Sequence, residues 1–137
     1  MFIADTHSDT LFSLGVMKRP LAECCITPER LHKGGVTLQT FALWSGPKGP
    51  AGDYRAVAEA EYAAVSQLTA AGLRQVDAPH EAREGENAFM LSLEGCEVFQ
   101  DGLSAVADWR ARGVRFRRWP WSATGCTPTS PPASTTA

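Results

Sequence analysis

The chain has 137 residues, of which 44% are hydrophobic and 20% are charged, and its formal net charge is −2. This length and composition suit one globular domain with a hydrophobic core. There is no basic patch for nucleic acid and no polybasic run for an anionic membrane, and no apolar run reaches the ~18 residues of a membrane span. We see no signal peptide, and the four cysteines form no Cys-x-x-Cys pair, so we expect a reduced, cytoplasmic compartment.

The first apolar run, residues 2–7, predicts a β-strand that leads into His7-Ser8-Asp9. Residues two apart in a strand point to the same side, so His7 and Asp9 should project together where the strand becomes a loop. An imidazole and a carboxylate that converge in this way can hold a divalent metal such as Zn²⁺. The alternative is that Asp9 caps a helix over residues 9–15 and His7 is an ordinary polar residue, because His-x-Asp is a short and common pattern.

A short helix and a second strand come next. Thr27 is typical of an N-cap and Pro28 of the first helical position, and the Gly34-Gly35 pair should end this helix. Residues 36–44 are rich in β-formers and predict a strand, followed by a loop of glycines and prolines over residues 45–52.

A long amphipathic helix is expected from Asp53 to about Ala71. Its apolar residues recur at spacings of three and four, which predicts one stripe packed against a sheet: Tyr54, Val57, Ala58, Tyr62, Val65 and Leu68. Gly72 should end the helix, and a further short helix is expected after Pro79.

The remaining elements repeat this alternation. Residues 87–95 form an almost continuous apolar run that ends in Glu94-Gly95, as in a strand covered on both faces. Residues 101–112 predict a helix, and Val114 begins a fourth strand. The inward-facing candidates of that helix are Leu103, Val106, Ala107 and Trp109. Strands that alternate with helices favour an α/β fold with a parallel sheet and right-handed crossovers.

Residues 117–137 differ from the rest of the chain. They contain no Leu, Ile, Val or Met and no acidic residue, and they are rich in Ser, Thr, Pro and Ala. Such a composition cannot build a packed strand or helix, so we expect disorder. Two explanations stand open: a natural flexible tail, or a shift of the reading frame near codon 117.

Glu94 adds a second group with ligand chemistry at a strand end. In an eight-stranded α/β barrel the carboxyl ends of the strands surround one mouth, where Glu94 could meet His7 and Asp9. Such a carboxylate could complete a metal site or bridge two metals. The alternative for Glu94 is a loop or helix-capping carboxylate.

Taken together, the motifs resemble the N-terminal part of a membrane dipeptidase (renal dipeptidase-like, peptidase family M19) of the amidohydrolase superfamily. The resemblance rests on four stretches in the family's order: residues 3–10 (IADTHSDT), 31–41 (LHKGGVTLQTF), 91–96 (LSLEGC) and 112–116 (RGVRF). It covers nearly all of residues 1–116, which it identifies as a partial (β/α)₈ TIM-type barrel that reaches the start of strand four. A full barrel takes about 250 residues.

The resemblance implies a zinc-dependent dipeptidase with a binuclear centre. His7 and Asp9 would bind one zinc, and Glu94 would bridge it to a second, with a metal-bridging water as the nucleophile. The family takes two further zinc-binding histidines, another active-site histidine, an arginine and a catalytic aspartate from later strands, and none has a counterpart here. His32 and His80 are expected on the surface, so no catalytic or substrate-binding residue is identified.

Several functions therefore remain open at this stage. The chain could be a dipeptidase by lineage that is inactive as written, a non-catalytic fragment, or a single-zinc module completed by a partner chain. Another amidohydrolase chemistry, such as that of a deaminase or lactonase, also fits His-x-Asp. A dipeptide is the expected substrate, nucleic acid and a membrane span are not expected, and open barrel edges favour self-association.

Overall fold

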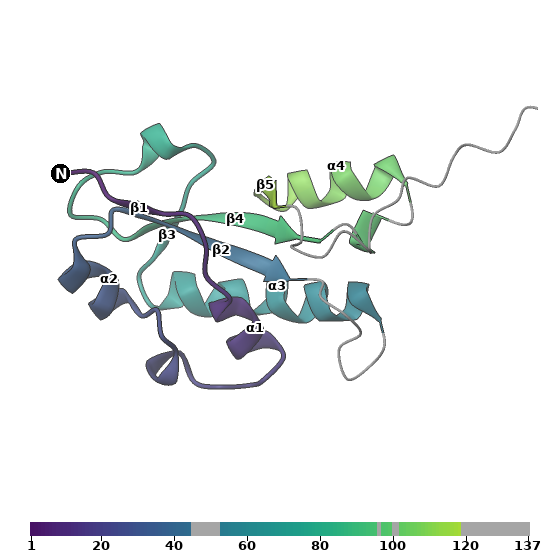
Figure 1. Ribbon diagram of the computed structural model, residues 1–137, viewed down its shortest axis with the longest axis horizontal. Helices are drawn as coiled ribbons and strands as arrows, with labels where there is room; N and C mark the ends of the chain where they lie inside the picture. Colours follow the sequence, from purple (N-terminus) through teal and green to yellow (C-terminus); the bar gives the residue numbers. More distant parts are fainter. Residues whose placement is uncertain (45–52, 96, 100–101, 119–137) are drawn as a thin grey trace, which may run out of the picture.

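The computed structural model describes residues 1–44, 53–95, 97–99 and 102–118, and its centre is a five-stranded parallel sheet (Figure 1). β2 lies between β1 and β4, while β3 pairs with the first half of β4 and β5 with its second half. The strands are β1 (Ala4–Asp5), β2 (Leu38–Trp44), β3 (Arg74–Gln75), β4 (Ala88–Glu94) and β5 (Val114–Arg118). The all-parallel pairing confirms the expected α/β class.

Helices connect these strands, and their ends follow local sequence chemistry. The α-helices are α1 (Thr10–Gly15), α2 (Pro28–Gly34), α3 (Tyr54–Ala70) and α4 (Leu103–Ala111), with 3₁₀ turns η1 (Leu21–Glu23), η2 (Pro79–Glu81) and η3 (Glu97–Phe99). The Thr27 hydroxyl accepts the Arg30 N–H at the start of α2, and Gly35 ends that helix with φ +66°. The Asp53 carboxylate accepts the N–H groups of Arg55 and Ala56 at the start of α3. Both predicted caps are confirmed.

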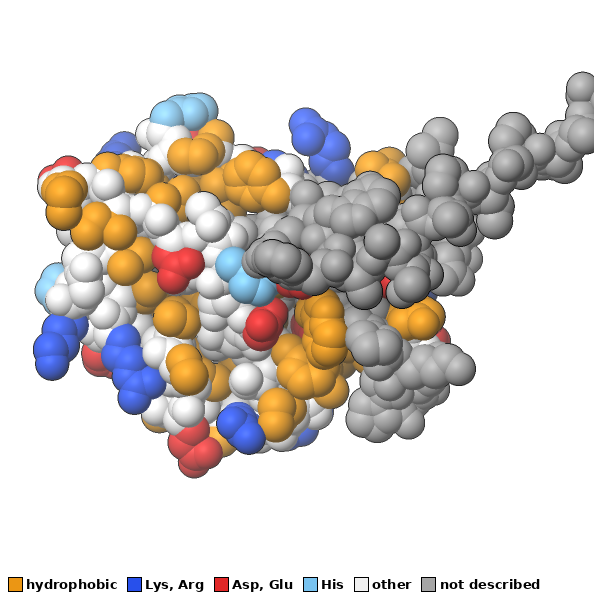
Figure 2. Space-filling model, in the orientation of Figure 1, with side chains coloured by type: hydrophobic (Ala, Val, Ile, Leu, Met, Phe, Trp, Pro, Cys, Tyr) orange, Lys and Arg blue, Asp and Glu red, His pale blue; other side chains and the backbone are white. Residues whose placement is uncertain are grey.

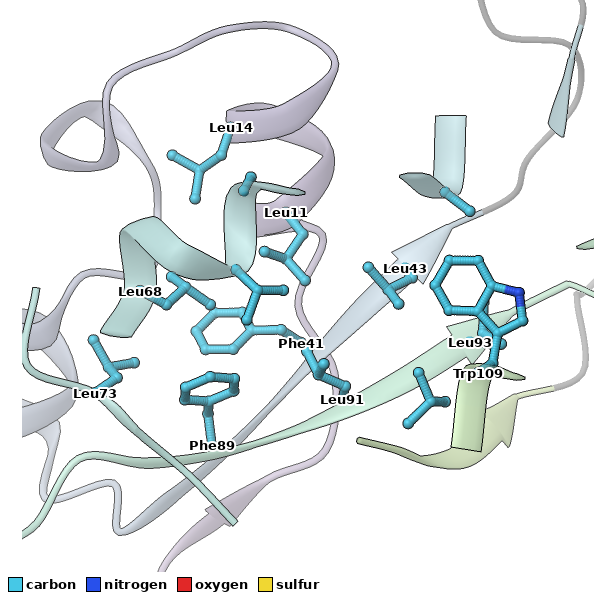
Figure 3. Packing of buried hydrophobic residues seen from close by; sticks show 14 of the residues in the cluster. Leu11, Leu14, Phe41, Leu43, Leu68, Leu73, Phe89, Leu91, Leu93 and Trp109 are labelled. Carbon is cyan, nitrogen blue, oxygen red and sulfur yellow. The ribbon is translucent and has the colours of Figure 1, made fainter. Parts of the chain in front are cut away.

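One face of the sheet, called the outer face here, packs against helices (Figure 3). Apolar side chains of β2 and β4 pack there against α1, α3 and α4, and Phe41 and Phe89 meet edge to face with ring centroids 5.8 Å apart. The members labelled in Figure 3 are Leu11, Leu14, Phe41, Leu43, Leu68, Leu73, Phe89, Leu91, Leu93 and Trp109. This layer is the main hydrophobic core.

The opposite, inner face carries smaller and more polar side chains. A cavity of about 420 Å³ opens on it, lined by residues of four strands and of the turn at Pro79: Ala4, Thr6, Leu38, Thr40, Pro79, Met90, Ser92 and Phe116. Phe116 is 46% exposed, although it is a large apolar side chain on a strand. A minor apolar cluster lies at one end of this face, where Leu38 and Met90 pack with Val76 and Ala82.

Some expectations need correction. The first strand is shorter than expected, β3 was not expected, and β5 continues to Arg118. Val106 and Ala107 of α4 are exposed instead of inward-facing, and Ala105 and Trp109 are buried. Trp109 is thus buried as expected, while the side chain of Leu103 lies outside the described residues. Ala105 and Trp109 are four residues apart and so share one face of the helix.

The predicted loop at residues 45–52 lies outside the described residues, as do residues 119–137 of the C-terminal segment. Within the described part of the chain, no helix has the length and apolar character needed to cross a membrane.

Candidate metal centre

His7, Asp9 and Glu94 come together where β1 and β4 end. Nε2 of His7 lies 3.3 Å from Oδ1 of Asp9 and 3.3 Å from Oε2 of Glu94. One ligand-type atom from each residue lies within 4.8 Å of the other two. Figure 2 shows histidine and acidic side chains gathered near the middle of the visible face. The structure thus joins three residues that the sequence places at two distant strand ends.

The spacing of these atoms fits a shared cation better than hydrogen bonds alone. One imidazole nitrogen carries at most one proton, so it cannot donate a full hydrogen bond to two carboxylates at once. Charge-assisted N–H···O bonds are also shorter, at about 2.7–2.9 Å. Two donor atoms that each bind Zn²⁺ at about 2.0–2.1 Å in a tetrahedral arrangement lie roughly 3.3–3.4 Å apart. The donor set and the two distances from His7 Nε2 therefore suit a divalent cation, and the two carboxylate oxygens lie within 4.8 Å of each other.

Backbone contacts fix the segment that carries His7 and Asp9. Oδ1 of Asp5 accepts the His7 N–H at 3.1 Å, and the Ala42 N–H of β2 donates to the Ser8 carbonyl at 2.9 Å. The second bond continues the pairing of β1 with β2 past the formal end of β1. The two ligand residues that flank Ser8 are therefore tied to the sheet.

The structure argues against the alternative role of Asp9 as a helix cap. Asp9 occupies the N-cap position of α1, but its side chain makes no capping hydrogen bond. The Ser8 hydroxyl accepts the Thr10 N–H at 3.3 Å instead and also pairs with the Thr10 hydroxyl at 2.7 Å. The Asp9 carboxylate, 60% exposed, faces His7.

Glu94 is the last residue of β4 and is more shielded than Asp9. Its side chain is 14% exposed, and its Cα is paired with that of Trp44 on β2. Nδ1 of His7 is buried and has no hydrogen-bond partner among the described residues. Metal-binding histidines usually donate this second N–H to a carboxylate, a carbonyl or water. His32 and His80 are both exposed, as expected, and take no part in the group.

A buried carboxyl group, Glu61 of α3, was missed by the sequence analysis. It has no exposed surface, and its Oε2 accepts the Trp44 N–H at 2.5 Å. Burial raises the pKa of Glu61 to about 9; the Trp44 N–H opposes this rise, and the charges of Asp9 and Glu94 add to it. The signal was present in the sequence, because Glu61 is three residues after Ala58 and four before Val65, in the middle of the apolar stripe.

The chain resembles known proteins in its three-dimensional structure. No protein-family model matches the chain, and no curated protein does. A solved structure of dipeptidase AC, a metallo peptidase of family M19, superposes with a TM-score of 0.70 at 19% identity. The probable dipeptidase PvdM from Pseudomonas aeruginosa superposes with a TM-score of 0.73 at 16% identity. The chain therefore shares its fold with part of each of these two structures.

The dipeptidase likeness covers most of this chain but less than half of either neighbour. It spans 89% and 91% of this chain, and 43% and 36% of dipeptidase AC and PvdM, respectively. The expected fold class, part of a (β/α)₈ barrel, is thus confirmed, and the resemblance to an M19 dipeptidase is confirmed at the level of the fold. The candidate metal centre lies at the carboxyl ends of the strands, which is where (β/α)₈ barrels carry their chemistry.

Proposed function

We propose that this chain provides part of the metal centre of a zinc-dependent dipeptidase, with His7, Asp9 and Glu94 as ligands. The observation that carries the proposal is the approach of both carboxylates to Nε2 of His7, each at 3.3 Å. The group sits at the strand ends of a fold shared with a metallo-dipeptidase and a probable dipeptidase. Those neighbours favour a dipeptide as substrate over the substrates of other amidohydrolases.

The ligand chemistry supports zinc as the ion. Imidazole and carboxylate ligands suit Zn²⁺, and the distances from His7 Nε2 to the two carboxylates would allow all three residues to hold one ion. When bound, a divalent ion of this kind acidifies water and polarises a carbonyl group. His7 and Asp9 would hold the ion from one strand end and Glu94 from the other. Only one oxygen of Glu94 faces His7 in this pair, so its second carboxylate oxygen could bind a second ion.

A second candidate function is a single-metal module that needs a partner for catalysis. The observation that favours it is the ligand count, since the described residues contain one group of three possible ligands and no second one. A binuclear centre would take its further ligands from elsewhere, so we expect no dipeptide hydrolysis by this chain alone.

Metal titration of the full 137-residue chain tests the proposal. After removal of metal by a chelator, Zn²⁺ is titrated in competition with a chromophoric chelator, and Co²⁺ is titrated by its visible spectrum. We expect one ion per chain, lost in His7→Ala and retained in His32→Ala, which alters an exposed histidine on α2. Equal binding by wild type and His7→Ala, or none by wild type, would contradict the site. Zinc-dependent dipeptide hydrolysis that His7→Ala abolishes would instead exclude the module.

A further inference from the structure

We propose that Glu61 is a positioning residue of this metal centre: its carboxyl group caps the end of β2 and so fixes the two backbone segments that carry the ligands. The inference rests on the proposed function, because it assigns Glu61 a part in metal binding by His7, Asp9 and Glu94.

The first step of the argument is the hydrogen-bond ladder between β1 and β2. The Ala42 N–H donates to the Ser8 carbonyl. In a parallel ladder the next N–H on the same side, that of Trp44, needs a carbonyl two residues beyond Ser8. That residue is Thr10, which already begins α1. Glu61 reaches across from α3 and accepts the Trp44 N–H in its place.

The second step is that this end of β2 touches both ligand-bearing segments. Ala42 holds the Ser8 carbonyl, between His7 and Asp9, and Trp44 is the Cα partner of Glu94. The Trp44 ring also meets the Phe12 ring of α1 edge to face, with centroids 5.3 Å apart. A loose Trp44 backbone would therefore loosen the alignment of Glu94 with the His7 segment.

The third step is that burial of a carboxyl group costs free energy unless the group is hydrogen-bonded, and Glu61 offsets this cost through the Trp44 N–H. Oε1 of Glu61 is buried and has no hydrogen-bond partner among the described residues. The helices also approach closely here, since a Cβ on Gly15 of α1 would lie 2.7 Å from the Glu61 Cα. In its neutral form the Glu61 carboxyl group accepts the Trp44 N–H and adds no negative charge to those of Asp9 and Glu94.

Two substitutions at Glu61 distinguish the effect of the hydrogen-bond acceptor from the effect of side-chain packing. Glu61→Gln keeps a neutral oxygen acceptor of nearly the same shape, while Glu61→Leu fills the space and leaves the Trp44 N–H without a partner. Leu68→Ala is the matched control, because Leu68 is buried on the same helix and belongs to the hydrophobic core. All are made in the full chain, and Zn²⁺ and Co²⁺ affinities are measured with the thermal midpoint and the Trp44 amide proton shift.

We expect Glu61→Leu to weaken metal binding by about tenfold or more, as losses of residues that support metal ligands do. The Trp44 amide resonance should move upfield and the Co²⁺ spectrum should change. Glu61→Gln should bind both ions as wild type does. Leu68→Ala should lower the thermal midpoint and leave the metal affinity unchanged.

Three results would overturn the inference. Wild-type affinity in a folded Glu61→Leu would show that the acceptor does not matter while leaving the metal site intact. Weak binding by a folded Glu61→Gln would show that the negative charge matters instead, and this holds even if Glu61→Leu does not fold. Absence of binding by wild type would remove the proposed function and this inference together.

Discussion

The two faces of the sheet differ in how completely they are packed. The outer face buries large side chains such as Phe41 and Phe89 under three helices. The inner face carries Thr40 and Ser92, opens on a cavity and leaves Phe116 half exposed. The metal-ligand candidates lie where β1 and β4 end, at the edge of both faces. The unfolding free energy of this chain should therefore come mainly from packing on the outer face. The inner face and the strand ends contribute less packing and remain accessible to a ligand.

Phe41→Ala should have the largest effect on stability. Phe41 has no exposed surface and stacks edge to face on Phe89. Truncation of a buried Phe leaves a cavity and costs about 3–5 kcal/mol of unfolding free energy. Urea denaturation followed by tryptophan fluorescence measures this loss. A cost below about 1 kcal/mol, the average for point mutations at all kinds of site, would mean that the outer face is not the core.

The outer face is also the part of the fold that the sequence predicts best. β2, β4 and α3 were expected within a few residues, because long apolar runs and stripes outweigh local variation. β3 was missed, since two residues pairing with the edge of β4 leave no pattern. The inward positions expected on α4 were partly wrong. The burial of Val106 depends on which side of the helix faces the sheet, and helical periodicity alone does not determine that side.

The pH dependence of stability should follow Glu61. Its pKa is about 9 in the folded chain and near 4.5 when unfolded, so the folded state holds the extra proton between these values. The stability gained from this proton is complete below pH ~4.5 and is lost as the pH rises toward 9. In chelator, wild type should lose up to about 1.4 kcal/mol per pH unit more than Glu61→Gln between pH 6 and 8. Parallel curves for the two proteins would mean that Glu61 is ionised when folded.

Gly15→Ala should have an intermediate effect, and it tests whether the core is coupled to the proposed metal centre. A Cβ at Gly15 would lie 2.7 Å from the Glu61 Cα and meet the Ala60 carbonyl, so α1 would have to move away from α3. Overpacking of this kind costs about 1–3 kcal/mol. Because Asp9 precedes α1 directly, Zn²⁺ affinity should fall as well. Gly72→Ala is the comparison variant. A Cβ at Gly72 would meet no atom, but the φ of +92° is unfavourable for Ala, so this variant should lower stability without affecting zinc binding.

The metal-ligand candidates illustrate a second limit of sequence reasoning. His7 and Asp9 could be paired from their spacing, and Glu94 from its place at a strand end, because parallel strands align their carboxyl ends. The role proposed for Glu61 depends on a contact between α3 and the end of β2, because Glu61 and Trp44 are seventeen residues apart in sequence. No local pattern encodes that contact. A charged residue within an apolar stripe was the one available sign.

Phe116→Ser should have the smallest effect on folding and the clearest effect on association. Phe116 lines the inner cavity and is 46% exposed, so its replacement should cost about 1 kcal/mol of unfolding free energy, well below the cost at the fully buried Phe41. An exposed aromatic ring on an open sheet face favours self-association, so the variant should sediment with a smaller weight-average mass than wild type at the same concentration. Sedimentation velocity over a concentration series measures this. A stability loss as large as that of Phe41→Ala would contradict the contrast between the two faces, because it would make the inner face a packed core in this chain.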